Sequence, residues 1–146
     1  MKLDFQRDTE NTFRINSRLP IDPLTKYKDL KKVTLPEGIT HIPRSTFNYR
    51  EKITSVFLPN TLTFIGTNAF AYCDGLTKVI FPTGLTRIGR GAFNNCLNLF
   101  EVYIPNTVTV IDEMAFYNCP NLTKVIFSQE EGEPLEVADY AFFGCH

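Results

Sequence analysis

The sequence predicts a repeat solenoid, in which short strands from successive coils line up around one apolar core. Three observations predict this fold class. Similar stretches return every 23 residues, starting at Leu30, Ile53, Leu76, Leu99 and Leu122. Within each stretch the apolar residues keep the same positions, and a proline follows the first apolar group in four of the five stretches. Because one stretch alone has too few apolar residues for a core, each unit needs its neighbours to be stable.

The first element expected in each unit is a short strand. With the starting residue as position 1, positions 4 and 6 are apolar, an alternation typical of a strand with one buried side. Position 4 is Val33, Val56, Val79, Val102 and Val125, and position 6 is Leu35, Leu58, Phe81, Ile104 and Phe127. Proline at position 7 has no N–H for a ladder and so ends the strand, at Pro36, Pro59, Pro82 and Pro105.

A second extended segment and a returning turn complete each unit. Positions 10 and 13 carry the apolar pairs Ile39 and Ile42, Leu62 and Ile65, Leu85 and Ile88, and Val108 and Ile111. Phenylalanine at position 18 (Phe47, Phe70, Phe93 and Phe116) predicts a turn or a single helical turn that returns the chain. Phe142 takes this position in the fifth unit if three extra residues are allowed, and we expect the acidic stretch 128–136 to loop out.

Residues 1–29 do not follow the repeat. The alternation in residues 2–6 and 12–16, around the polar residues 7–11, predicts a hairpin that covers the first unit. Such a cap is needed because the end of a solenoid exposes apolar surface and strand edges. Residues 19–29, with two prolines, predict an irregular connection. The predicted domains are therefore a cap with its connection, 1–29, and a repeat domain, 30–146, with units 30–52, 53–75, 76–98, 99–121 and 122–146.

These residues resemble the BspA-like class of leucine-rich repeats, whose units read roughly LxxVxxPxxLTxIGxxAFxxC. The resemblance covers residues 30–146, with an altered fifth unit and with Thr46 and Arg50 in place of alanine and cysteine in the first. It implies a curved, right-handed, leucine-rich-repeat-like β-solenoid and, commonly, a role in binding or adhesion at microbial surfaces.

Composition excludes some classes of function. Hydrophobic residues make up 43% and charged residues 21%, as in an ordinary globular domain, and the net charge of −1 gives no reason to expect a nucleic acid partner. No apolar run is long enough to insert into a membrane, and no apolar stretch at the N-terminus marks a secretion signal. We therefore expect a cytoplasmic protein from the sequence as written, or a surface or secreted one if it is a fragment.

The cysteines recur at position 21, which raises the question of a metal or redox site. Cys73, Cys96 and Cys119 share this position, and Cys145 matches it after the insertion. Zinc sites pair ligands two to four residues apart, whereas side chains stacked on successive coils suit a buried ladder of small apolar groups. His41 and His146 lie far apart in sequence and suggest no Cys-His pair. We therefore expect no catalytic site, no metal and no cofactor.

The outward positions of the first strand are the candidate binding site. With positions 4 and 6 buried, positions 3 and 5 point to solvent, on the face that is concave in leucine-rich repeats. The candidates are Phe57, Ile80, Tyr103 and Ile126 at position 5, Lys32, Lys78, Glu101 and Lys124 at position 3, and Phe64 and Arg87 at position 12 of the second segment. Contiguous apolar surface of this kind suggests an interface, although strands favour such residues anyway.

Three hypotheses about function follow. The leading one is a non-enzymatic module that binds another protein on this face. The second is a self-assembling or adhesive fragment of a longer repeat array, with a homo-oligomer formed through the C-terminal end. The third is a small cytosolic effector or inhibitor that occludes a target protein.

Overall fold

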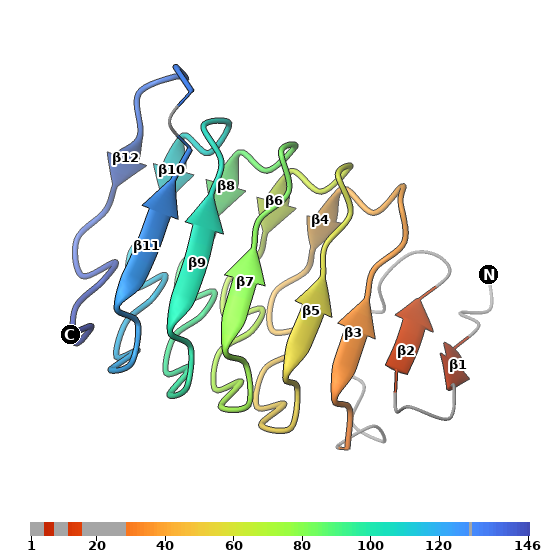
Figure 1. Cartoon of the computed structure of the whole chain (residues 1–146). Coiled ribbons are helices and arrows are strands. Elements are labelled where there is room, and N and C mark those ends of the chain that lie inside the picture. Colours follow the sequence, from red (N-terminus) through yellow and green to blue (C-terminus); the bar gives the residue numbers. More distant parts are fainter. Residues whose placement is uncertain (1–4, 8–11, 16–28, 129) are drawn as a thin grey trace.

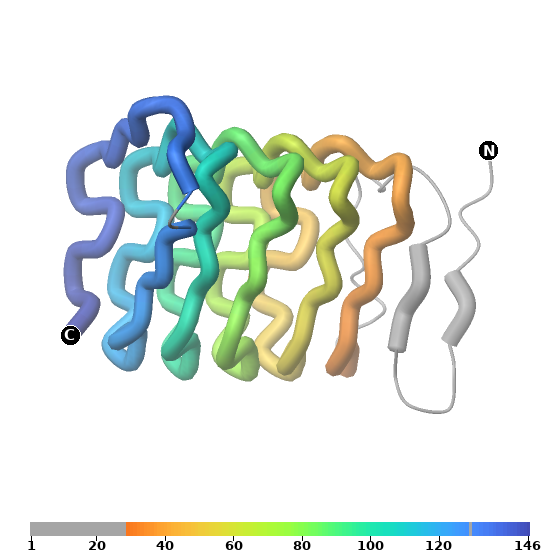
Figure 2. The backbone as a smooth tube through the Cα atoms, turned by 45° about the horizontal axis from the view of Figure 1, so that its top comes forward, coloured from red at the N-terminus to blue at the C-terminus, as the bar shows by residue number. Residues whose placement is uncertain are grey.

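The computed structural model describes residues 29–128 and 130–146, together with the backbone of residues 5–7 and 12–15. The repeat residues form five stacked coils that wind in a right-handed sense, each lying against the next (Figure 1 and Figure 2). We number these coils 1 to 5, from the unit that starts at Leu30 to the unit that starts at Leu122. The predicted solenoid is confirmed.

The first strand of each coil lies on one side of the solenoid, in front in Figure 1. These strands are β3 (Lys32–Thr34), β5 (Ser55–Phe57), β7 (Lys78–Ile80), β9 (Glu101–Ile104) and β11 (Lys124–Phe127). They run parallel, and equivalent residues of neighbouring coils face each other, as Val79 faces Val102 and Val102 faces Val125. We call the outward side of these five strands the strand face.

A second sheet lies behind these strands, which themselves pair in two groups, β3 with β5 and β7 with β9 and β11 (Figure 1). It contains β4 (His41–Ile42), β6 (Phe64–Ile65), β8 (Arg87–Ile88), β10 (Val110–Ile111) and β12 (Glu136–Val137), all paired in parallel. Both sheets turn one side toward a shared core, in which Val79 and Ile88 are almost fully buried. Their outward sides therefore point in opposite directions.

A column of stacked aromatic rings fills the core between the sheets and the returning turns. It consists of Phe47, Phe70, Phe93, Phe116 and Phe142, one from each coil. Ring centroids of neighbours lie 5.0 to 5.4 Å apart, with the rings nearly parallel. This spacing matches the distance between neighbouring strands, about 4.8 Å, so one ring per coil packs without gaps.

The returning segment of each coil is a series of turns, and no helix occurs among the residues that the structure describes. Two residues per coil have a left-handed backbone, for example Asn68 and Tyr72 in coil 2. This conformation sends N–H groups toward the next coil, where Phe70 donates to the carbonyl of Ala92 and Tyr72 to that of Asn94. Hydrogen bonds between coils thus replace those within a helix.

The predicted N-terminal hairpin is confirmed. Strands β1 (Phe5–Arg7) and β2 (Thr12–Ile15) pair antiparallel, and β2 lies parallel to β3, so that the hairpin extends the sheet of coil 1. Of the predicted irregular connection, residues 19–28 lie outside the described residues. The domain boundary between residues 29 and 30 stays a prediction.

Coil 5 confirms the predicted offset of three residues. The ring of Phe142 stacks on that of Phe116 at 5.1 Å, and β12 pairs with β10. Between β11 and β12 the chain rises beyond the turns of the other coils (Figure 1), and the described residues 128 and 130–134 are exposed. The acidic insertion is therefore accommodated outside the core.

Candidate interaction surface

The predicted apolar row lies on the strand face. Phe57, Ile80 and Tyr103 expose 57%, 61% and 37% of their surface, respectively, and Ile126 is half-buried. The strand registers place Ile80, Tyr103 and Ile126 directly beside one another. Phe57 lies at the same position of the preceding coil, so one row of large apolar side chains crosses the strands.

A charged row runs beside the apolar one, with Lys78 and Lys124 exposed and Lys32 half-buried. Glu101 differs from its expected exposure, because only 9% of it is accessible. The ammonium of Lys78 lies 3.6 Å from the Glu101 carboxylate and 5.0 Å from the centre of the Tyr103 ring. In this contact the charges of Lys78 and Glu101 compensate each other, and exposed Lys124 leaves the row with a net positive charge.

Two predicted residues lie on a different surface. Phe64 in β6 and Arg87 in β8 belong to the second sheet, whose outward side points away from the strand face. The Arg87 guanidinium donates two hydrogen bonds to Asp112, at 2.7 and 2.8 Å. Phe64 and Arg87 therefore do not share a surface with Phe57 and Tyr103. The reason is that the proline-led turn between positions 5 and 12 of each unit reverses the direction of the chain.

Two exposed apolar residues near the strand face were missing from the sequence-based candidates. Phe100 lies immediately before β9, and Leu97 lies three residues before Phe100. Each of the two residues is about two-fifths exposed. The sequence carries a signal for Phe100, because the equivalent position in the other units is lysine or threonine. A large apolar residue at a position that is otherwise polar indicates a surface role.

The cysteines form the expected ladder. Cys73, Cys96 and Cys119 are buried and unpaired, and each thiol donates to the carbonyl of the preceding coil's phenylalanine at 3.1 to 3.2 Å. Burial raises the pKa of Cys73 and of Cys119 to about 12 and that of Cys96 well above its usual value. Thiols held in the neutral form are poor nucleophiles and poor metal ligands.

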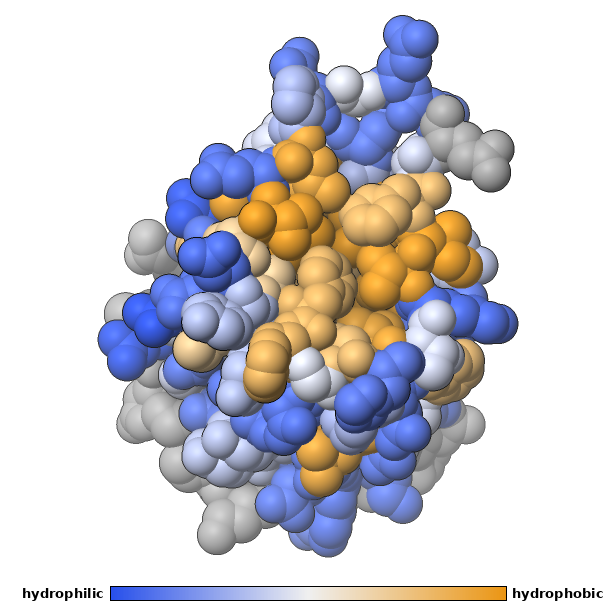
Figure 3. Space-filling view, turned by 90° about the vertical axis from the view of Figure 1, so that its left-hand side faces the viewer, coloured by the Kyte–Doolittle hydropathy of each residue, from blue (hydrophilic) through white to orange (hydrophobic). Residues whose placement is uncertain are grey.

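The end of coil 5 presents a second apolar surface. Figure 3 shows hydrophobic residues gathered at its centre with hydrophilic residues around them. Among the large apolar residues of coil 5, Phe127, Val137, Tyr140 and Phe143 are about half exposed. In earlier coils the corresponding surface is covered by the next coil, so this end has the shape of a stacking surface.

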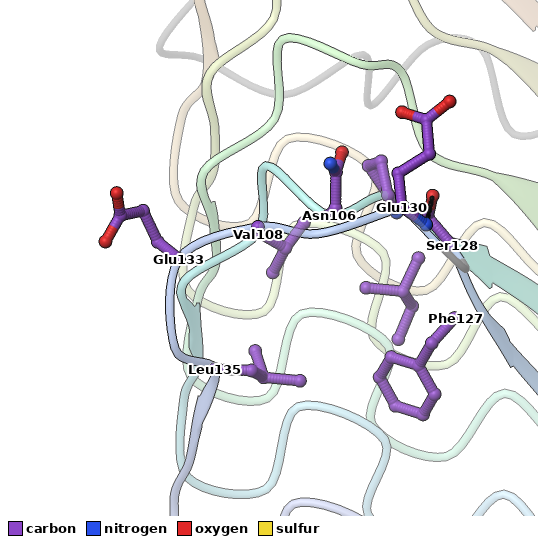
Figure 4. A pocket seen from close by; sticks show the side chains of 10 residues that line it. Asn106, Val108, Phe127, Ser128, Glu130, Glu133 and Leu135 are labelled. Atoms are coloured by element: carbon purple, nitrogen blue, oxygen red, sulfur yellow. Dashed lines mark hydrogen bonds between the residues drawn. The ribbon is translucent and has the colours of Figure 1, made fainter.

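A pocket of about 160 Å³ opens beneath the acidic loop of coil 5 (Figure 4). Val108, Phe127 and Leu135 line it, and Glu130 and Glu133 lie at its rim. Ligand sites usually enclose about 300–1,000 Å³, so this space is small for a cofactor. Among the described residues no group of three His, Cys, Asp or Glu could hold a metal ion. Nor does that part of the chain contain a helix with the length and apolarity to span a membrane.

Comparisons with solved structures give the fold. A leucine-rich cell surface protein from Faecalibacterium prausnitzii A2-165 superposes with a TM-score of 0.61 at 20% identity, covering 86% of this chain and 38% of that protein. A leucine-rich repeat protein from Eubacterium ventriosum ATCC 27560 gives 0.59 at 25% identity, with 84% and 41% covered. The leucine-rich repeat protein of T. pallidum gives 0.55 at 18% identity, with 97% and 86% covered.

The chain thus spans about two-fifths of the F. prausnitzii and E. ventriosum proteins. No curated protein matches it significantly. The model of the BspA type leucine-rich repeat region matches residues 24–146 in six copies. The chain belongs to the BspA-type leucine-rich repeat family.

Proposed function

We propose that the chain is a non-enzymatic module that binds a partner protein through its strand face. The leucine-rich repeat family and its structural relatives support a role in protein interaction or as a surface repeat. One observation carries the choice of face: Phe57, Ile80 and Tyr103 expose large apolar side chains in one row. Solvent-exposed apolar rows with a polar rim are typical of interfaces, and aromatic residues dominate their binding energy.

The charges on the same face suggest the chemistry of the partner. Lys124 is exposed beside the apolar row, whereas Lys78 and Glu101 compensate each other in an ion pair. A partner with an apolar group next to a carboxylate therefore complements this face near Lys124.

Affinity capture from source-cell lysate tests the proposal. Wild type is compared with Phe57→Ala/Tyr103→Ala, which removes two rings from the strand face. The matched control is Tyr49→Ala/Tyr72→Ala, which removes two stacked rings from the returning turns. A protein retained by wild type and the control but lost with the first variant supports the proposal. Equal recovery by all three overturns the choice of face.

A location at the cell surface, within a longer repeat protein, belongs to the same proposal. It rests on the F. prausnitzii relative, which is a cell surface protein and of which the chain spans 38%. Labelling of intact source cells with an antibody against the five coils checks it. Labelling that appears only after permeabilisation favours instead an effector or inhibitor inside the cell.

The apolar end of coil 5 supports a second candidate function, self-association. Residues 53–146 carry 4 Lys/Arg and 9 Asp/Glu, whereas residues 1–52 carry 11 and 7, so the acidic end of one copy complements the basic end of another. Light scattering over a range of concentrations checks this candidate. A mass that rises with concentration, and that Phe143→Ser abolishes, supports head-to-tail stacking; a constant monomer mass removes it.

A further inference from the structure

Two tyrosine rings stack on each other at the returning turns of coils 1 and 2. Tyr49 and Tyr72 occupy position 20 of their units, and their ring centroids lie 4.4 Å apart with 10° between the ring planes. Tyr49 exposes 58% of its surface, and Tyr72 is half-buried. Two phenol groups are therefore held together at the surface of the protein, and we call them the tyrosine pair.

The backbone holds the tyrosine pair in position. Both residues have the left-handed conformation, with φ of 58° at Tyr49 and 59° at Tyr72. The N–H of Tyr49 donates to the carbonyl of Ala71 at 2.9 Å. The N–H of Tyr72 donates in the same way to the carbonyl of Asn94 at 2.8 Å. Because each tyrosine is joined to the next coil by an equivalent hydrogen bond, the two side chains start from equivalent points of neighbouring coils, and the stacking follows from the repeat.

The other coils make different contacts at these turns. Coils 3 and 4 have Asn95 and Asn118 at position 20, and the amide of Asn118 donates to the side-chain oxygen of Asn95. Tyr117 in coil 4 stacks on Phe143 of coil 5, with centroids 5.5 Å apart. Among the ring contacts of the described residues, the tyrosine pair alone places one phenol on another. The turns of coils 1 and 2 thus differ from the others in their chemistry.

Adjacent phenols allow a reaction that a single phenol does not. A one-electron oxidant takes one electron and the O–H proton from each ring and leaves two phenoxyl radicals. The radicals combine through a carbon–carbon bond between ring carbons next to the oxygen-bearing carbons. The hydrogen of each bonded carbon then moves to the oxygen of its own ring, which restores two phenols. In total the protein loses two hydrogen atoms, and one molecule of hydrogen peroxide accepts them to become two molecules of water.

The geometry favours coupling within the tyrosine pair. Reacting groups that a protein holds at about 3–3.5 Å behave as if they were highly concentrated. The two ring centroids are about 1 Å farther apart than this, and rotation of the exposed Tyr49 side chain closes the gap. Burial, together with the neighbouring phenol of Tyr49, raises the pKa of Tyr72. At neutral pH Tyr72 is therefore a neutral phenol, the form that loses a proton together with an electron.

We propose that Tyr49 and Tyr72 are joined as dityrosine when the protein meets hydrogen peroxide and a haem peroxidase. The bond links coil 1 to coil 2 and closes a loop between residues 23 positions apart. Such a cross-link stabilises the fold chiefly by restricting the unfolded chain. Coil 1 gains most from it, because the terminal units of a solenoid lack a repeat neighbour on one side. The inference is independent of the strand face and of its partner.

Oxidation of the full chain by a haem peroxidase and an equimolar amount of hydrogen peroxide tests the proposal. At low protein concentration we expect dityrosine fluorescence and a monomeric product that is lighter by two hydrogen atoms. Digestion of this product should give a cross-linked peptide pair with Tyr49 and Tyr72. Tyr49→Phe and Tyr72→Phe each keep the ring but remove the phenol, and we expect each to lower the fluorescence about tenfold. Tyr117→Phe, the matched control, removes the phenol that stacks on Phe143 and should leave the fluorescence unchanged.

Two further measurements separate the effect of stacking from the intrinsic reactivity of tyrosine. The same oxidation in concentrated urea, where the stack is lost, should give a much lower yield of the Tyr49–Tyr72 peptide pair. The cross-linked protein should unfold at a higher urea concentration than the untreated protein, and an unchanged midpoint overturns the stabilising role. Absence of dityrosine in the folded protein, undiminished fluorescence in Tyr49→Phe or Tyr72→Phe, an equal yield in urea, or cross-links found only between molecules overturn the inference. In each of these cases the proposed binding by the strand face still stands.

Discussion

Two rows of large side chains cross the five coils, one inside and one outside. The inner column is phenylalanine in every coil: Phe47, Phe70, Phe93, Phe116 and Phe142. The outer row changes from coil to coil: Thr34, Phe57, Ile80, Tyr103 and Ile126. Inside, each ring must fit between two identical neighbours, so one residue type is retained. Outside, the neighbour is solvent or a partner, and the residues are free to differ.

The largest expected effect is the loss of stability when one ring is removed from the inner column of phenylalanines. Phe93→Ala leaves a cavity between Phe70 and Phe116, and we expect a loss of about 3–5 kcal/mol in the free energy of unfolding. Phe142→Ala, at the half-buried end of the column, is expected to lose roughly 1–2 kcal/mol. Urea unfolding followed by circular dichroism measures both. Equal losses would contradict the view that each ring is stabilised from two sides.

The buried cysteine ladder should make the stability of the protein depend on pH. Burial raises the pKa of Cys73 and of Cys119 to about 12, whereas unfolded thiols titrate near pH 8.5. Above about pH 9 the unfolded chain releases protons that the folded chain keeps, so the free energy of unfolding falls as pH rises toward 12. The expected slope is about 1.4 kcal/mol per pH unit and thiol. Urea unfolding between these pH values should show a shallower fall for Cys73→Ala/Cys119→Ala; an identical fall would contradict this prediction.

An ion pair on the outer surface should contribute less to the free energy of unfolding than the phenylalanine column or the cysteine ladder. Arg87 and Asp112 form two hydrogen bonds, but half of the Arg87 side chain is exposed. We expect Arg87→Met to lower the free energy of unfolding by about 0.5 kcal/mol, less at high salt. Thermal unfolding at low and high salt measures the change. Arg90→Met, which loosens a longer contact of 3.5 Å to Glu113, serves as the control and should change less.

The outer row is expected to contribute least to stability. Phe57 is more than half exposed, so Phe57→Ala should change the free energy of unfolding by no more than about 0.5 kcal/mol. The same variant should weaken partner capture strongly. Calorimetric unfolding alongside the capture experiment tests both halves, and a large loss of stability would place Phe57 among the structural residues.

Much of the fold could be predicted from the 23-residue period of the sequence. The inward valines and the column of phenylalanines recur in all five coils, and the proline that ends the first strand recurs in four of them. They recur because the same packing problem recurs in each coil. The period also locates Phe142 despite the insertion, and the ring stacks on Phe116. The apolar row of the strand face follows as well, since Phe57 and Tyr103 alternate with buried residues.

Other features depend on contacts between coils, which the repeat period in the sequence does not predict. The sequence pattern groups position 12 with the strand face, yet Phe64 and Arg87 lie on the second sheet, because the turn between the two extended segments reverses the chain. Glu101 occupies an outward position but is buried by Lys78 and its surroundings.

The sequence by itself determined the repeat, the inward residues and the identity of the outward ones, because these depend on local alternation and on spacing along the chain. The tertiary structure alone decided which outward residues share a surface and which of them are buried, as Glu101 is. Those outcomes depend on how the chain turns between the two sheets and on contacts between neighbouring coils, such as that of Lys78 with Glu101. Packing between neighbours is thus the physical source of what the period leaves open.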